Sequence, residues 1–134
     1  MKKKLNSILF IDDDEPTNFL NKMVVEQFDC TCQVQVLESG QAALSYLSGD
    51  CPRPDLIFLD INMPAMDGWE FLGKYRDLPP AKKADIVLIM LSTSLNPDDK
   101  TRTRQFPEVA GFESKPLLQS GLEDLLKRHF PQCF

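Results

Sequence analysis

Short apolar runs alternate with amphipathic segments along the whole chain, and this alternation limits the folds open to it. Five runs have the length and composition of strands, at residues 7–12, 32–37, 55–60, 85–92 and, more weakly, 110–114. The runs at 55–60 and 85–92 are apolar almost throughout, which is typical of central parallel strands covered on both faces. The run at 32–37 alternates apolar and polar residues, which indicates an edge strand.

Helical patterns fill the spaces between these runs. The first helix is expected after the acidic residues 12–15, with Pro16 in its first turn. Its expected inward stripe consists of Leu20, Met23, Val24 and Phe28. Further helices are expected at 41–48, 68–78, from 96 to before Pro107, and at about 119–130.

Three helix starts carry capping signals. Asp67 precedes the third helix, and Asn96 followed by Pro97 begins the fourth. Ser120 and Glu123 have the spacing of a capping box at the last helix. The inward stripe of that last helix is expected to be Leu122, Leu125 and Leu126.

Five strands alternating with five helices form βαβ units, which require parallel strands and right-handed crossovers. The expected fold is α/β and flavodoxin-like: a doubly wound five-stranded parallel sheet in the order 2-1-3-4-5, with helices on both faces. The chain has 134 residues, and no linker or repeat divides it. One domain over residues 1–134 is therefore expected.

Composition excludes several classes of function. The 15 Lys and Arg residues face 20 Asp and Glu, a net charge of −5, which argues against nucleic-acid binding. The longest apolar run, 86–91, is far shorter than the roughly 20 residues that span a bilayer. The basic start is followed by an apolar stretch that ends at acidic residues, unlike a secretory signal. A cytoplasmic protein is expected.

The four cysteines do not indicate a disulfide framework in a chain of this kind. A zinc site built from Cys30, Cys32, His129 and Cys133 is conceivable, but the closely spaced ligand pairs usual in zinc sites are missing. Reduced, inert thiols are expected instead, with Cys51 among them. His129 is expected to be a packing or partly exposed residue of the last helix.

Polar side chains follow the strands at the sheet edge where ligands bind in this fold class. Asp12, Asp13 and Asp14 follow the first run, Asp60 ends the third, residues 92–94 end the fourth, and Lys115 follows the fifth. Converging carboxylates repel one another unless a cation joins them, and Mg²⁺ prefers oxygen ligands. Asp60 is the expected nucleophile for a phosphoryl group, because it closes a buried strand without adjacent acids.

These residues resemble the receiver domain of two-component response regulators over essentially the whole chain. The matching stretches are residues 8–14, 55–64 with 66–68, 91–94, 111–112 and 115–116. The segment D-x-N-M-P-x-M-D-G, at residues 60–68, is highly specific for that family.

The resemblance implies a role for each matching position. Asp60 would accept the phosphoryl group, Asp13 would ligate Mg²⁺ directly, and Asp12 would do so largely through water. Asn62 would contribute its backbone carbonyl. The alignment of the three N-terminal acids with the family's two acidic positions could shift by one residue. Asp13 and Asp14 are therefore the alternative acidic pair.

The resemblance also implies a switch. Ser92 and Lys115 would hold the phosphoryl oxygens, and Phe112 would turn inward when Ser92 moves toward them. The Lys115–Pro116 bond would be cis. Ser92 stands where the family usually has threonine, and Thr93 stands where it prefers a smaller residue. Ser94 and Asn62 occupy the positions that tune self-dephosphorylation. The sequence therefore does not determine how long the phosphoryl group would remain on Asp60.

The implied partners are a histidine kinase or histidine phosphotransfer protein as donor and a downstream effector protein, with the chain a monomer or a phosphorylation-dependent dimer. Because the sequence ends at Phe134, no attached output domain is expected, and neither is enzyme activity. One alternative is a phosphorylation-independent interaction module of the same fold. A second alternative is an Mg²⁺-dependent aspartyl-phosphate phosphatase. Such enzymes carry a second acid two residues after the nucleophile, where this chain has Asn62. Flavodoxins need a hydroxyl- and glycine-rich first loop, which here is acidic.

Overall fold

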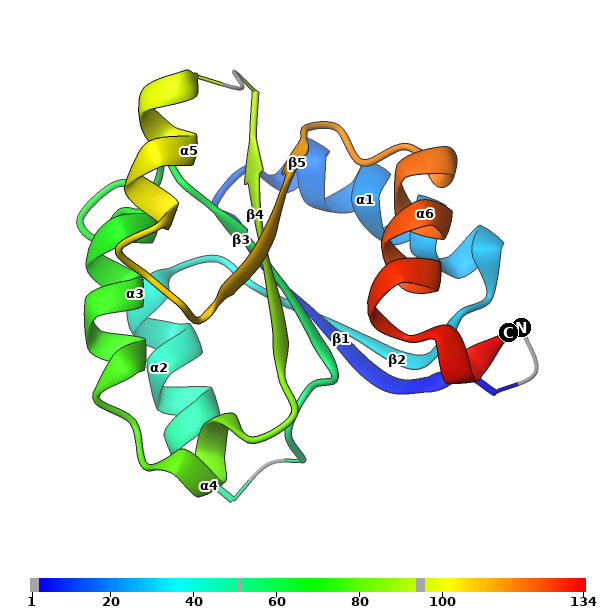
Figure 1. Cartoon of the computed structure of the whole chain (residues 1–134), viewed down its shortest axis with the longest axis horizontal. Coiled ribbons are helices and arrows are strands. Elements are labelled where there is room, and N and C mark those ends of the chain that lie inside the picture. Colours follow the sequence, from blue (N-terminus) through cyan, green and yellow to red (C-terminus); the bar gives the residue numbers. More distant parts are fainter. Residues whose placement is uncertain (1–2, 51, 94–95) are drawn as a thin grey trace.

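The computed structural model describes residues 3–50, 52–93 and 96–134. Its five strands form one parallel sheet, in the order β2-β1-β3-β4-β5, between layers of helices (Figure 1). The strands are β1 (Leu5–Ile11), β2 (Thr31–Leu37), β3 (Leu56–Asp60), β4 (Val87–Ser92) and β5 (Val109–Ser114). The predicted strand order is confirmed, and β2 lies at an edge as its alternating pattern indicated.

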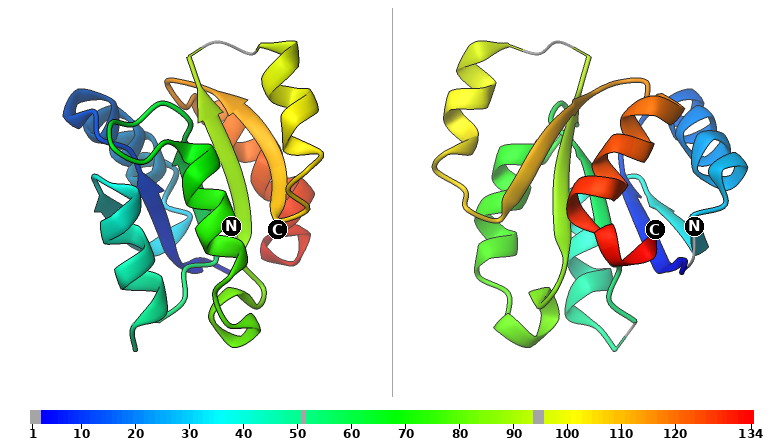
Figure 2. Two further views of the ribbon diagram at one scale, coloured as in Figure 1. Left: turned by 90° about the vertical axis from the view of Figure 1, so that its left-hand side faces the viewer. Right: turned by 45° about the vertical axis from the view of Figure 1, so that its right-hand side comes forward.

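Helices cover both faces of the sheet. The pair α1 (Glu15–Phe28) and α6 (Gln119–His129) packs on one face, and α2 (Gly40–Ser48) and α3 (Gly68–Arg76) pack on the other (Figures 1 and 2). On the α3 side lies α5 (Pro97–Thr103). Two short elements complete the described chain, the one-turn α4 (Pro80–Lys83) and the 3₁₀ turn η1 (Pro131–Cys133).

The strand pleat divides the core into two clusters. In β1, Ile8 and Phe10 face the cluster beneath α1 and α6, whereas Leu9 and Ile11 face the cluster beneath α2 and α3. Every residue of β3 is buried, which explains its continuous apolar sequence. Phe10 and Phe58 of the neighbouring strands stack with ring centroids 5.0 Å apart, and this contact ties the centre of the sheet together.

Most predicted caps are confirmed. The side chain of Asp67 accepts a hydrogen bond from the first turn of α3, and that of Asn96 accepts one from the first turn of α5. The capping box at Ser120 is wrong. The residue before α6 is Leu118, which makes no side-chain cap, and Ser120 is already inside the helix. The helix itself begins at Gln119, as predicted, so only the predicted capping residue differs.

The predicted inward stripe of α1 is partly wrong. Leu20 and Met23 are exposed, whereas the buried positions of the helix are Asn18, Asn21 and Val25. Val24 and Phe28 do pack against the core, half-buried. The helix is therefore turned so that two amide side chains, rather than two large apolar ones, face the molecule.

The third helix ends at Arg76, two residues before the predicted end, and α4 was not expected. Pro80 occupies the first turn of α4, a position that suits proline because its missing N–H has no helical partner there. Among the described residues, no helix combines the length and apolar character needed to cross a bilayer.

Candidate functional site

Three carboxylates meet at the carboxyl edge of the sheet. Asp60 is the last residue of β3, and Asp12 follows β1, the parallel neighbour of β3. Oxygen atoms of Asp12, Asp13 and Asp60 lie within 4.8 Å of one another, the one such group of possible metal ligands in the described part of the chain. Asp12 and Asp60 are only 1% and 3% exposed, whereas Asp13 is exposed to solvent.

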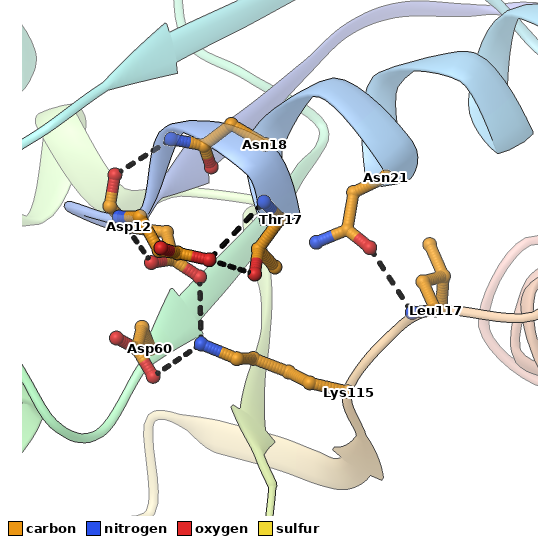
Figure 3. Close-up of polar contacts among 8 residues, drawn as sticks. Asp12, Thr17, Asn18, Asn21, Asp60, Lys115 and Leu117 are labelled. Carbon is orange, nitrogen blue, oxygen red and sulfur yellow. Dashed lines mark hydrogen bonds and ion pairs between the residues drawn. The ribbon is translucent and has the colours of Figure 1, made fainter.

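A lysine ammonium joins two of these carboxylates. Lys115, in the loop after β5, places its Nζ 2.9 Å from Asp12 Oδ2 and 3.1 Å from Asp60 Oδ1 (Figure 3). Its backbone N–H donates to the Ser92 carbonyl at the end of β4, at 2.8 Å. The Lys115–Pro116 peptide bond is cis, as the family resemblance implied. Residues from β1, β3, β4 and β5 thus converge on one point.

The electrostatics of the site follow from this packing. Burial raises the pKa of Asp60 to about 6, the Asp12 carboxylate adds to the shift, and the Lys115 ammonium opposes it. Burial lowers the pKa of Lys115, but its hydrogen bonds to Asp12 and Asp60 more than offset this, so its pKa is raised. Lys115 therefore stays charged while the site as a whole carries more negative than positive charge.

The donor set fits a hard divalent cation. All the ligand atoms of the group are carboxylate oxygens, and the exposed Asp13 leaves one side open to water. Of the two acidic pairs left open by the sequence, Asp12 and Asp13 belong to the group with Asp60. Asp14 instead caps α1 by accepting from the Thr17 backbone N–H and hydroxyl. The side chain of Asn62 is exposed, and its backbone N–H lowers the pKa of Asp60.

The remaining predicted site residues lie around this centre. Ser92 is buried at the end of β4, and Thr93 beside it is exposed. Phe112 of β5 is half-buried against the cluster beneath α2 and α3. Ser94 lies outside the described residues.

The cysteine and histidine set does not form a site. Cys30 and Cys133 are buried and Cys32 is exposed, all three as free thiols, while Cys51 lies outside the described residues. Burial raises the pKa of Cys30 to about 11, so its thiol stays protonated. His129 is half-buried in α6. Within the residues that the structure describes, these groups do not gather as metal ligands do.

Sequence reasoning missed two residues of α1 that support the site. Asn18 Nδ2 donates to the Asp12 backbone carbonyl at 2.8 Å, and Asn21 Oδ1 accepts from the Leu117 N–H at 3.0 Å (Figure 3). Asn18, Asn21 and Val25 do have the i, i+3, i+7 spacing of one helical face, but two polar amides on a face give no signal that it is buried.

Gly68, the first residue of α3, belongs to the matching segment 60–68, but the sequence did not predict its role in packing. Its N–H donates to the Ile61 carbonyl at 2.7 Å. A Cβ at this position would lie 2.8 Å from the Asp60 carbonyl oxygen and 2.9 Å from the Ile61 Cα. Only glycine allows α3 to approach the end of β3 this closely.

Comparison with known proteins agrees with this geometry. The sequence profile of the response regulator receiver domain matches residues 8–127. Response regulator Rcp1 of Synechocystis sp. is 33% identical over 97 residues, covering 69% of this chain and 65% of that protein, so the match spans slightly less than two thirds of its length. The probable methanogenesis regulatory protein FilR2 of Methanothrix harundinacea is 30% identical over 122 residues, covering 88% of this chain and 75% of that protein.

Solved structures show the same fold. The crystal structure of a two-component response regulator from Cytophaga hutchinsonii has a TM-score of 0.85 at 30% identity, over 96% of this chain and 99% of that one. A chemotaxis protein of Vibrio cholerae, CheY4, shares the fold with a TM-score of 0.79 at 24% identity, over 94% of this chain and 99% of that one. The profile covers most of the chain, and the strand order agrees with these structures. This chain therefore belongs to the response regulator receiver family.

Proposed function

We propose that Asp60 accepts a phosphoryl group from a phosphohistidine of a sensor kinase or histidine phosphotransfer protein, in a reaction that depends on Mg²⁺. The chain then signals to an effector protein by a change of conformation. The observation that carries this proposal is the buried Asp60 carboxylate, which lies in contact with Lys115 Nζ and within ligand distance of Asp12 and Asp13.

In the proposed transfer, the residues of the site supply the nucleophile, the ligands for Mg²⁺ and a fixed cation. A carboxylate oxygen of Asp60 attacks phosphorus, and the bond from phosphorus to the imidazole nitrogen breaks. The donor imidazole, which carries a proton on its other ring nitrogen, takes the electron pair of that bond and leaves as the neutral ring. Asp12, Asp13 and Asp60, with the backbone carbonyl of Asn62, would hold Mg²⁺, which when bound neutralises charge on the phosphoryl oxygens. Lys115 Nζ is fixed where the product, an acyl phosphate, would carry its negative charge.

The proposed signal arises from the same contacts. Phosphorylation adds roughly −1.5 to −2 charge at the end of β3. The Ser92 hydroxyl, on the adjacent β4, would donate to a phosphoryl oxygen, and the Phe112 ring would turn further into the core. Changing such a two-state equilibrium from mostly inactive to mostly active requires about 5.5 kcal/mol of preferential stabilisation.

A protein donor needs a surface beside the site. The large apolar side chains that are exposed in the described residues are Phe19, Leu20, Met23 and Leu118. Three lie on α1, and the fourth follows Leu117, whose N–H is bonded to Asn21 of α1. Leu118 thus lies in the segment that follows Lys115, and the other three lie on the helix to which that segment is bonded. We propose that these four side chains form the surface that contacts the domain bearing the donor phosphohistidine.

The first experiment tests the acceptor. Incubation with acetyl phosphate and Mg²⁺ should add one phosphoryl group to the wild-type chain and none to Asp60→Asn, as measured by intact-mass spectrometry. The control variant is Asp98→Asn, an exposed carboxylate in the first turn of α5, which should be labelled like the wild type. Undiminished label on Asp60→Asn would refute the acceptor.

Two further measurements separate the alternatives. We propose that the chain is not an enzyme, so repeated turnover of a phosphate ester should be absent; sustained hydrolysis would favour a phosphatase. Mg²⁺ titration followed by fluorescence of Trp69, the sole tryptophan, should saturate. Neither Mg²⁺ binding nor labelling would be expected of a phosphorylation-independent interaction module.

A second experiment tests the donor surface. Phe19→Ser should slow transfer from a phosphorylated histidine phosphotransfer protein that labels the wild type, because an apolar contact outside the site is lost. Its rate with acetyl phosphate should be unchanged. Gln33→Ala, an exposed substitution on β2, serves as the control. Equal slowing with both donors would place the effect of Phe19 inside the site and contradict this assignment.

A further inference from the structure

The buried face of α1 carries two amides where an amphipathic helix usually carries apolar residues. Asn18 and Asn21 are 6% and 0% exposed. In each, one end of the amide is bonded to the backbone, and the other end, Asn18 Oδ1 or Asn21 Nδ2, has no hydrogen-bond partner among the described residues. Burying such a group costs free energy. Core packing alone therefore does not account for these two amides.

Both amides bond to backbone groups next to the proposed site. Asn18 Nδ2 donates to the carbonyl of Asp12, and Asn21 Oδ1 accepts from the N–H of Leu117, two residues after Lys115 (Figure 3). Asp12 and Lys115 are themselves joined by an ion pair of 2.9 Å. One face of α1 thus holds the backbone on both sides of that ion pair.

The Lys115 segment is attached at two points. The Lys115 N–H donates to the Ser92 carbonyl at 2.8 Å, and the Leu117 N–H donates to Asn21 Oδ1 at 3.0 Å. Pro116, between them, has no N–H. Both backbone donors of this segment are therefore used, one toward β4 and the other toward α1. Loss of the second would leave the segment bonded to β4 alone.

We infer that Asn21 is a positioning residue for Lys115. By holding the backbone at Leu117 against α1, Asn21 keeps Lys115 Nζ between the carboxylates of Asp12 and Asp60. This inference rests on the proposed phosphoryl transfer. A fixed ammonium stabilises the developing charge without first having to reorganise, so loosening it should slow the transfer itself. Binding of Mg²⁺ to the three carboxylates should be nearly unaffected.

The test uses Asn21→Leu, which keeps the approximate size of the side chain and removes the acceptor oxygen. At saturating Mg²⁺ and acetyl phosphate, the rate of phosphorylation should fall about tenfold, the size typical of losing a group that orients a functional side chain. The Mg²⁺ affinity, followed by Trp69 fluorescence, should be unchanged, because Asn21 bonds the Leu117 backbone and none of the three carboxylates. The matched control is Val25→Ala, on the next turn of the same buried face, which should lower stability and leave both quantities unchanged.

Two further variants test whether the effect passes through Lys115. Asn21→Asp retains an acceptor oxygen and should recover most of the rate. Adding Asn21→Leu to Lys115→Ala should slow the reaction no further, because two changes that act through one group are not additive.

Three results would overturn the inference: an Asn21→Leu rate equal to wild type, a parallel weakening of Mg²⁺ binding, or full additivity with Lys115→Ala. If the wild-type chain itself takes up no phosphoryl group, the proposed function fails, and this inference fails with it. A labelled wild type with an equally fast Asn21→Leu overturns the positioning role alone.

Discussion

Asp60 is buried although its proposed role requires a charged carboxylate, so it lowers the stability of the fold. Its pKa is about 6 in the folded chain, raised from an ordinary value of 3.8 by burial and by Asp12. Between these two pH values the folded chain keeps a proton that the unfolded chain has lost. Stability therefore falls as pH rises through this window, and above it the full cost of the buried charge remains.

Replacing this carboxylate should reveal that cost. Asp60→Asn is expected to be more stable than wild type at pH 7.5 without Mg²⁺, by about 3 kcal/mol, since each unit of pKa shift corresponds to about 1.4 kcal/mol. The difference should shrink as the pH is lowered from 6 to 4. Urea unfolding at a series of pH values measures this difference in stability. The Lys115 ammonium is not left without a partner in the variant, because its ion pair with Asp12 remains. A difference independent of pH would contradict the assigned shift.

Two glycines of α3 offer a matched pair of substitutions. Gly68→Ala should destabilise the fold by about 1–3 kcal/mol, because the new Cβ would press against the backbone of Asp60 and Ile61. Gly73→Ala, in the exposed middle of the same helix, meets no heavy atom of the described chain within 4 Å. It should stabilise the helix by about 0.5–1 kcal/mol. Thermal unfolding measures the stability of both variants. Equal changes in stability would show that the backbone at Gly68 leaves room for a Cβ.

Among the elements, α5 is held differently from the other long helices. None of its residues, all of which are described, is buried. The Arg102 guanidinium lies 4.6 Å from the centre of the Trp69 ring, and that of Arg76 lies 4.9 Å from the centre of the Phe106 ring. Trp69 and Phe106 contact each other, with centroids 5.8 Å apart. Stacking of arginine side chains on aromatic rings therefore joins α5 to α3, whereas the other long helices are held by buried apolar residues.

Removing one of these stacks should release α5 locally. Arg102→Ala is expected to cost about 0.5–1 kcal/mol and to speed amide hydrogen exchange in α5, while exchange in α6 is unchanged. Arg104→Ala, an exposed change at the end of α5, is the control. The fluorescence of Trp69 should change only in Arg102→Ala. Uniform acceleration of exchange throughout the sheet would instead mean that α5 is part of the global folding unit.

For the whole molecule, the three carboxylates link metal binding to folding, because only the folded sheet brings Asp12, Asp13 and Asp60 together. Mg²⁺ at ten times its dissociation constant should raise the free energy of unfolding by about 1.4 kcal/mol. Asp13→Asn should abolish most of this gain and change stability little without Mg²⁺, since Asp13 is exposed. Denaturation with and without Mg²⁺, at matched ionic strength, tests both statements. An undiminished gain in Asp13→Asn would exclude this carboxylate as a ligand.

Local sequence alone determined the strands and most helix ends of this protein. The unbroken apolar run before Asp60 is a central strand because both of its faces are covered, and Pro97 begins a helix because its ring suits the first turn. The βαβ alternation predicted parallel strands, and with them the edge of the sheet where the acidic residues meet; the strand order was expected from the flavodoxin-like fold and is confirmed.

Only the tertiary structure decided the rotation of α1. Leu20 and Met23 have the spacing of a core stripe, yet Asn18 and Asn21 face inward, because backbone groups at Asp12 and Leu117 need partners there. A hydrogen bond between residues 96 positions apart leaves no trace in local periodicity. Ser120 likewise lies inside α6 and not at its cap, although its spacing from Glu123 is that of a capping box. The pKa of Asp60 also depends on distant residues, since Asp12 and Lys115 reach it only once the sheet has formed.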